Sequence, residues 1–102
     1  MTSPAVEKLV FAILLSAIKK RAEVIDLKCG RDRFVIDFIV DGARCEEMRP
    51  PLELQTPIFE QLQLMASDAG VIELVVGDDR HHLFAIVFST QGALQRCEIR
   101  PR

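Results

Sequence analysis

Tryptophan and tyrosine are absent from the 102-residue chain, and histidine occurs only twice. The missing aromatic side chains disfavour proteins that stack bases or sugars on aromatic rings. Positive charge is also scarce, because 13 Lys and Arg stand against 15 Asp and Glu, for a net charge of −2. Nucleic-acid binders usually carry a strongly basic surface, so we expect no nucleic-acid partner.

Motifs that hold phosphates or metals are missing as well. The sequence has neither a Gly-x-x-x-x-Gly-Lys-Ser/Thr loop nor a Gly-x-Gly-x-x-Gly loop, which are the two common backbone cradles for phosphate. The two histidines, His81 and His82, are adjacent, and adjacent residues of a strand point to opposite faces and cannot easily ligate one metal. We expect exposed turn histidines, with no cofactor, no metal and no enzymatic activity.

The three cysteines, Cys29, Cys45 and Cys97, form no Cys-x-x-Cys pair. An odd number of widely spaced cysteines without a secretion signal predicts reduced, buried thiols in a cytoplasmic protein. Cys97 shares its strand register with Ile99, which predicts a core position. A nucleophilic thiolate would need a base and an electropositive setting, so none of the three is expected to be catalytic.

No apolar run is long enough to cross a membrane. The longest, residues 9–17, contains Ser16 and is far shorter than a span of about 20 residues. Basic residues at positions 19–21 follow it, where a signal peptide would have small residues for cleavage. We expect this run to be a helix of a single domain covering residues 1–102, because 49% apolar content supports one core.

Ser3 and Pro4 predict the start of that helix, since serine is a preferred N-cap and proline a favoured first residue. One apolar face repeats at helical spacing: Val6, Leu9, Val10, Ile13, Leu14 and Ala17. A second apolar stripe lies beside it: Phe11, Leu15 and Ile18. Together they cover about 240° of the helix, well beyond an ordinary surface helix. Either the helix is buried on two sides within its own domain, or the second stripe meets another subunit or domain.

Alternation with a period of two predicts three strands after the helix, at residues 25–29, 34–40 and 43–49. Asp41-Gly42 is the strongest short-range hairpin signal, because both central residues of that turn need positive φ. The third strand is polar enough to predict a sheet edge.

A second helix follows Pro50-Pro51. Its expected apolar face is Ile58, Leu62, Met65 and Ala69. Thr56 as N-cap with Pro57 in the first position gives it a start, with residues 52–55 either a lead-in turn or a helical first turn. Gly70 is expected to end it.

The last third predicts strands at residues 71–76, 82–88 and 93–100, joined by turns at 77–80 and 89–92. Strands joined by short turns are antiparallel neighbours. The expected fold is therefore α+β in the order α-β-β-β-α-β-β-β, with an antiparallel sheet of about six strands and two helices packed against it.

Four stretches carry a resemblance to a known family. They are residues 10–28 (VFAILLSAIKKRAEVIDLK), 33–42 (RFVIDFIVDG), 50–66 (PPLELQTPIFEQLQLMA) and 82–100 (HLFAIVFSTQGALQRCEIR). In this order they resemble the small PAS-like domain immediately before the ATPase core in the secretion ATPases of type II secretion and type IV pilus assembly. The resemblance covers nearly the whole chain and implies a PAS-like fold.

Departures from the family pattern bear on function. The family carries arginines that face the nucleotide of the neighbouring core, and those positions are Val35, Asp37, Ile39 and Val87 here, while a family histidine is Asp26. Valine, isoleucine or aspartate cannot stabilise phosphoryl charge as arginine does. The sequence also ends where the Walker A core would begin. The resemblance therefore implies a stand-alone domain without the catalytic contribution.

We therefore expect a non-catalytic interaction module in the cytoplasm that binds itself or another protein, such as a pilus or secretion ATPase. The candidate interface residues are Phe11, Leu15, Ile18, Val35, Ile39 and Val87. The alternative is a small-molecule or nucleotide sensor, because PAS-like domains often hold a ligand between sheet and helix. The expected lining there has few polar groups, which favours a filled core. An apolar cavity would favour the sensor, and a solid core the interaction module.

Overall fold

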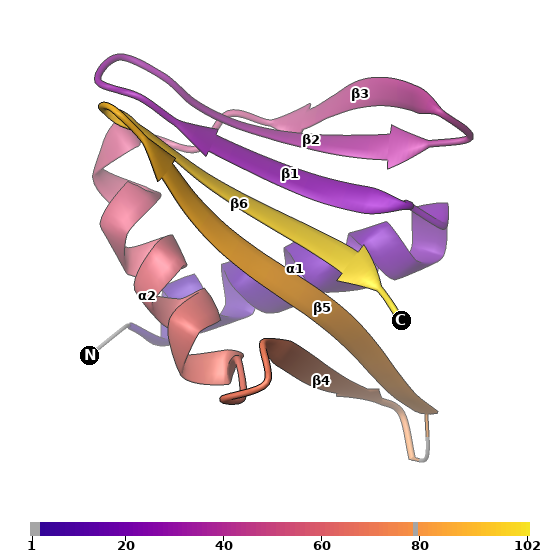
Figure 1. Cartoon of the computed structure of the whole chain (residues 1–102). Coiled ribbons are helices and arrows are strands. Elements are labelled where there is room, and N and C mark those ends of the chain that lie inside the picture. The colour runs from indigo at the N-terminus through magenta and orange to yellow at the C-terminus, as the bar shows by residue number, and fades with distance from the viewer. Residues whose placement is uncertain (1–2, 79) are drawn as a thin grey trace.

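A computed structural model describes residues 3–78 and 80–102 (Figure 1). Its elements are α1 (Pro4–Lys20), β1 (Val24–Cys29), β2 (Phe34–Val40), β3 (Ala43–Met48), the 3-10 helix η1 (Leu52–Leu54), α2 (Gln55–Met65), β4 (Val71–Val76), β5 (Arg80–Gln91) and β6 (Leu94–Pro101). The predicted α+β fold is confirmed, with two α-helices and one antiparallel sheet of six strands.

The strand order across the sheet is β3-β2-β1-β6-β5-β4. Two three-stranded meanders, each built from consecutive strands, therefore meet where β1 pairs with β6. Ile25 lies opposite Ile99 there, and Leu27 lies opposite Cys97. Both helices lie on the same side of the sheet (Figure 1). The molecule thus has two layers, with the core between the helices and one face of the sheet.

α1 begins as predicted. The Ser3 side chain accepts a hydrogen bond from the backbone N–H of Val6, and Pro4 occupies the first turn. The helix ends at Lys20, and the C-cap residue Arg21, with a left-handed backbone (φ 56°), donates its N–H to the carbonyls of Ala17 and Ile18. No helix in the described ranges is long and apolar enough to span a membrane.

α2 differs from the prediction at both ends. The helical alternative for residues 52–55 is correct, because η1 runs directly into α2 and Gln55 is its first residue. The prediction of Thr56 as N-cap is wrong, since Leu54 holds that position and Thr56 lies within the first turn. Pro57 is tolerated as the third residue because the first turn of a helix needs no intrahelical N–H donors. The helix ends at Met65 rather than near Gly70, since Ala66 is already extended. Ala69 is exposed and lies outside the helix.

The β5–β6 hairpin is longer than predicted. β5 begins at Arg80 and continues to Gln91, so the predicted turn residues 89–91 are paired strand residues and His81 and His82 lie in a strand. A long two-stranded pairing with β6 outweighs the polar turn signal in this segment. The predicted turn at 77–80 includes Asp79, which lies outside the described residues.

The core between helices and sheet is filled. Its fully buried side chains include Val10, Leu14, Ile25, Leu27, Cys29, Ile36, Phe38, Ile58, Ile72, Phe84, Cys97 and Ile99. Where α1, α2 and the central strands meet, the remaining void is about 10 Å³, which hardly accommodates one water molecule.

The Asp41-Gly42 turn has the backbone that the hairpin signal predicts, with φ of 52° and 77°. We expect Gly42→Ala to lower the free energy of unfolding by about 1 kcal/mol, because a Cβ is strained at that φ. Gly30→Ala is the matched control, since Gly30 has no positive φ and a Cβ at either glycine would meet no heavy atom within 4 Å. Thermal and urea unfolding measure both, and equal stabilities would contradict the turn assignment.

Candidate functional site

The face of the sheet turned away from the helices is uncovered by any described element (Figure 1). We call it the open face. Its side chains alternate along each strand with those of the core. On the central strands they are Val24, Asp26, Lys28, Val35, Asp37, Ile39, Arg96, Glu98 and Arg100. An antiparallel sheet often turns one polar face to water, and this face divides into a charged part and an apolar part.

Four carboxylates stand in one row across the charged part. In register they are Glu46 on β3, Asp37 on β2, Asp26 on β1 and Glu98 on β6. We call them the carboxylate row. Like charges directly opposite one another on neighbouring strands are destabilising, so the row requires cations on both sides of it.

Arginines from the two flanking strands supply those cations. Arg96 of β6 donates hydrogen bonds to both carboxylate oxygens of Asp26, from Nε to Oδ1 and from Nη2 to Oδ2, each at 3.0 Å. Arg44 of β3 bridges the two aspartates, with its Nη1 2.8 Å from Asp26 and 2.9 Å from Asp37. Asp26 is only 1% exposed although no helix covers it. The arginines themselves therefore exclude water from this carboxylate.

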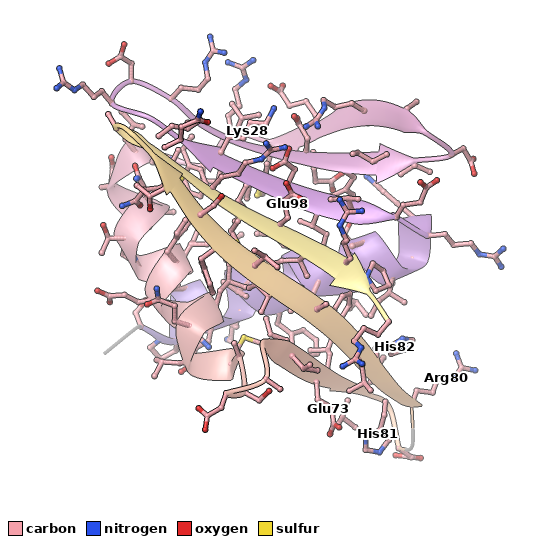
Figure 2. The ribbon with its side chains drawn as sticks, viewed as in Figure 1. Lys28, Glu73, Arg80, His81, His82 and Glu98 are labelled. Atoms are coloured by element: carbon pink, nitrogen blue, oxygen red, sulfur yellow. The ribbon has the colours of Figure 1, made fainter. Side chains whose placement is uncertain are left out.

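The remaining members of the row are also paired. Glu98 lies 3.1 Å from Arg100 and 3.5 Å from Arg96, and Glu46 pairs with Arg49. Lys28 is the third cation near Asp26, at 3.7 Å. Figure 2 shows Lys28 and Glu98 on the side of the sheet away from the helices. The carboxylate row is thus neutralised within the chain.

The electrostatics of Asp26 reflect two opposing effects. Burial raises the pKa of its carboxyl, while hydrogen bonds from Arg96 and Arg44 and the charges of Arg96 and Lys28 lower it more, so the pKa lies below its usual value. The ionised form is consequently favoured in the folded protein. This arrangement suits a structural ion cluster that links β3, β2, β1 and β6.

The apolar part of the open face lies on β4 and β5. Val75, Leu83 and Val87 are exposed there, and Val87 is the most open at 64%. Half-buried Ala85 lies between Leu83 and Val87 on β5. We call Val75, Leu83, Ala85 and Val87 the apolar strip. Sequence reasoning found only Val87, although Glu73 within β4 signals which alternate residues of that strand point outward.

The six predicted interface residues fall on two opposite sides of the molecule. Val35, Ile39 and Val87 are all on the open face, but Val35 is buried, Ile39 is half-buried, and both flank Asp37 rather than Val87. Phe11, Leu15 and Ile18 lie on α1, in the other layer. The structure therefore does not bring the six together in one patch.

The α1 stripe is partly covered by its own chain. Phe11 is 40% exposed, whereas Leu15 and Ile18 are half-buried and Ile18 packs against the core. Lys20, the last residue of α1, pairs with Glu47 of β3 at 2.7 Å and lies over the Phe38 ring. The part of the stripe that remains open is centred on Phe11.

The cysteines split into two groups. Cys29 and Cys97 are buried in the core, and burial raises the pKa of each thiol to about 12. Such thiols are poor nucleophiles, because the thiolate is the reactive form. Cys45 is exposed on the edge strand β3, so the prediction of buried thiols is wrong for this residue. β3 is an edge strand of the sheet, so it pairs with β2 on one side and with no strand of this sheet on the other.

The two histidines point away from each other, as adjacent strand residues must. His81 lies opposite Val75 on the open-face side, with Nδ1 3.3 Å from a Glu73 carboxylate oxygen. His82 lies opposite Leu74, on the helix side. Figure 2 shows His81 and Glu73 together near the end of the β4–β5 hairpin. Within the described ranges, no three His, Cys, Asp or Glu residues are placed to hold a metal ion.

Comparison with known proteins adds an independent finding. No protein-family model matches the chain. A segment of 62 residues is 45% identical to the type IV pilus assembly ATPase PilB of Myxococcus xanthus. The chain is related to the pilus assembly ATPases. This match supports the resemblance to that family.

The matched segment is a small part of PilB. It covers 61% of the chain but only 11% of PilB, so the chain spans about a tenth of this relative's length. ATPase activity and a role in pilus assembly are therefore properties of PilB. For this chain, the relation supports a common ancestry of the matched segment.

Asp26 provides a test of the ion cluster. We expect Asp26→Asn to lower the free energy of unfolding at pH 7 by about 3 kcal/mol, because it leaves Arg44 and Arg96 without their buried carboxylate. Since the folded-state pKa lies below the unfolded value, this stabilisation is complete above about pH 4 and is lost as the pH falls further. Urea unfolding from pH 7 to pH 2 should therefore show a shallower acid loss for the variant.

Glu98→Gln is the matched control in the same row. Glu98 is only partly buried, so its ion pairs should contribute about 1 kcal/mol or less. If the two variants lost the same free energy of unfolding at pH 7 and the same pH dependence below pH 4, a special role for Asp26 would be contradicted.

Proposed function

We propose that the chain is a non-catalytic interaction module related to the N-terminal domain of the pilus and secretion ATPases. It acts in the cytoplasm, either with a secretion or pilus machine or as a homo-oligomer. The observation that carries this proposal is the apolar strip on a sheet face that no described element covers. Contiguous exposed apolar patches on small proteins commonly mark interaction sites.

Burial of the apolar strip would supply a substantial driving force. Val75, Leu83 and Val87 are each at least 40% exposed, and burying a large aliphatic side chain completely contributes roughly 1.5–3 kcal/mol. The neighbouring Glu73, Glu98 and Arg100 give the strip a charged rim, which is the usual anatomy of a protein interface.

The filled core supports an interaction module over a sensor. PAS-type sensors would need a cavity in the core between the sheet and the helices, and the void where α1, α2 and the central strands meet is about 10 Å³. Small-molecule sites usually measure about 300 Å³ or more. The high pKa of the Cys29 and Cys97 thiols likewise disfavours covalent catalysis by these residues.

Light scattering tests the proposed surface. We expect the wild-type chain to self-associate in the micromolar range, or to form a complex when mixed with the type IV pilus assembly ATPase of its own organism. Val87→Arg should abolish the association while leaving the thermal unfolding temperature unchanged, because Val87 is already exposed. Leu64→Arg is the matched control, since Leu64 is equally open at 70% but lies on α2.

The double variant Phe11→Glu, Leu15→Lys distinguishes the α1 stripe from the apolar strip. Loss of association in this variant alone, with the fold intact, would move the interface to α1. Unfolding of the variant would mean that the stripe is internal core. A wild-type chain that stays monomeric and binds no ATPase at 100 µM, a test concentration of about one hundred times a micromolar Kd, would refute the proposal.

We expect neither ATP hydrolysis nor tight nucleotide binding. The phosphate loops are absent from the sequence, and Arg44 and Arg96 of the open face are held by Asp26 and Asp37. Calorimetric titration with ATP and magnesium should give no saturable heat, with the intact pilus assembly ATPase as the positive control. Micromolar affinity would contradict a non-catalytic role.

A further inference from the structure

A pocket of about 440 Å³ lies away from the carboxylate row, mostly on the helix side of the sheet, and shares only Leu83 with the apolar strip. It is formed where the end of α1, the start of β5 and the end of β6 meet, at the right of Figure 1. Its lining residues are Ala17, Ile18, Arg21, Ala22, His81, His82, Leu83, Phe84, Pro101 and Arg102. We call it the basic pocket.

The floor of the basic pocket is apolar. Phe84 is buried and lies opposite Pro101 in the β5–β6 register, so both belong to the helix-side face. Ile18 is half-buried at the end of α1, and the small residue Ala17 leaves space beside it. A large apolar side chain entering the pocket would therefore meet a continuous apolar surface.

The lining side chains that are charged at pH 7 are both arginines. Arg21 and Arg102 line the pocket, and His82 projects to the same side of β5. None of the described side chains that line the pocket bears a carboxylate. His81 reaches the opposite face and pairs with Glu73. The charged side chains of the pocket are therefore basic, although the chain as a whole has a net charge of −2.

The two arginines at the rim have no ion pair within the described ranges. The arginines of the open face, Arg44, Arg96 and Arg100, all pair with carboxylates of their own chain. In addition, Arg21 is the C-cap of α1, and the hydrogen bonds of its N–H to the end of the helix hold its backbone in place. Unpaired guanidinium groups beside an apolar floor are ready to receive an anion that is attached to an apolar group.

We propose that the basic pocket binds an acidic peptide segment of a partner protein, with a large apolar residue in the pocket and neighbouring Glu or Asp side chains on Arg21 and Arg102. Because Arg21 and Arg102 are positively charged, the segment that binds beside them is expected to be negatively charged. This inference rests on the proposed interaction function and names the chemistry of the partner at a second surface.

The shape of the basic pocket favours a peptide over a lipid chain. Arg21, His81, Leu83 and Arg102 are exposed, so the rim is open to solvent. Sites for small apolar molecules bury most of the ligand surface, whereas an open site suits one side chain of a longer segment. Ile18 also belongs to the α1 stripe, so further apolar residues of the segment could continue along α1 toward Leu15 and Phe11.

Fluorescence polarisation with a designed peptide tests the proposal. The probe is a fluorescein-labelled, amidated peptide with a leucine–phenylalanine pair between two pairs of glutamates. The first control peptide replaces the glutamates by lysines, and the second replaces the apolar pair by glycine and serine. We expect saturable binding of the probe that weakens as salt is added, and binding at least about tenfold weaker for either control.

A pair of double variants locates the site. Arg21→Gln with Arg102→Gln should raise the Kd of the probe about tenfold, because two charges at the rim are lost. Arg31→Gln with Arg33→Gln is the matched control. It removes two exposed arginines that also have no ion pair within the described ranges, but from the β1–β2 loop. Circular dichroism and thermal unfolding check that both double variants fold.

Each outcome decides the proposal. Equal weakening by the two double variants would indicate general charge attraction and would refute a specific site, as would failure of the probe to bind. Laurate serves as a competitor. If micromolar laurate displaced the probe and the probe itself bound only weakly, the pocket would be assigned to an acyl chain and the peptide proposal would be overturned. Association through Val87 is measured separately by light scattering, so its failure and that of the pocket are distinguishable.

Discussion

The structure depends on one buried carboxylate that has no layer above it. Asp26 is as inaccessible as the residues of the hydrophobic core, yet it lies on the uncovered face of the sheet. Its desolvation is offset by the two-point contact with Arg96 and the shared contact with Arg44. These contacts join strands from both meanders, so the centre of the sheet is closed from above by arginine side chains instead of by a third layer of structure.

This closure divides the open face into a charged part and an apolar part. On β3, β2, β1 and β6, cations and carboxylates satisfy one another, and Asp26 and Asp37 occupy positions where the resemblance places a histidine and an arginine. Arg44 and Arg96 are therefore engaged by the chain's own carboxylates. On β4 and β5, no such ion pairs cover Val75, Leu83 and Val87, so these apolar side chains are exposed.

Local signals in the sequence predicted most of the fold. Ser3-Pro4, the alternation along β2 and the Asp41-Gly42 turn each act within a few residues, so their positions follow from the sequence directly. The pairing of β1 with β6 brings together residues about 70 positions apart, as in the Asp26–Arg96 contact, and no short-range pattern encodes it. The ion cluster was missed for the same reason, because its arginines come from strands whose neighbours only the topology determines.

The end of α2 shows a different limit, in which tertiary packing overrides a local signal. Gly70 is a reasonable helix terminator, but β4 must start at Val71 to pair with β5, and the chain needs residues 66–70 to turn. Natural sequences agree with their fold at most positions, and departures concentrate where a protein meets its partners. Exposed valine and leucine on β4 and β5 depart from the polar pattern of an uncovered sheet face, and unpaired Arg21 and Arg102 depart from the pairing found on that face. Neither departure improves the isolated chain, and these two departures are the observations on which the proposed contacts with a partner rest.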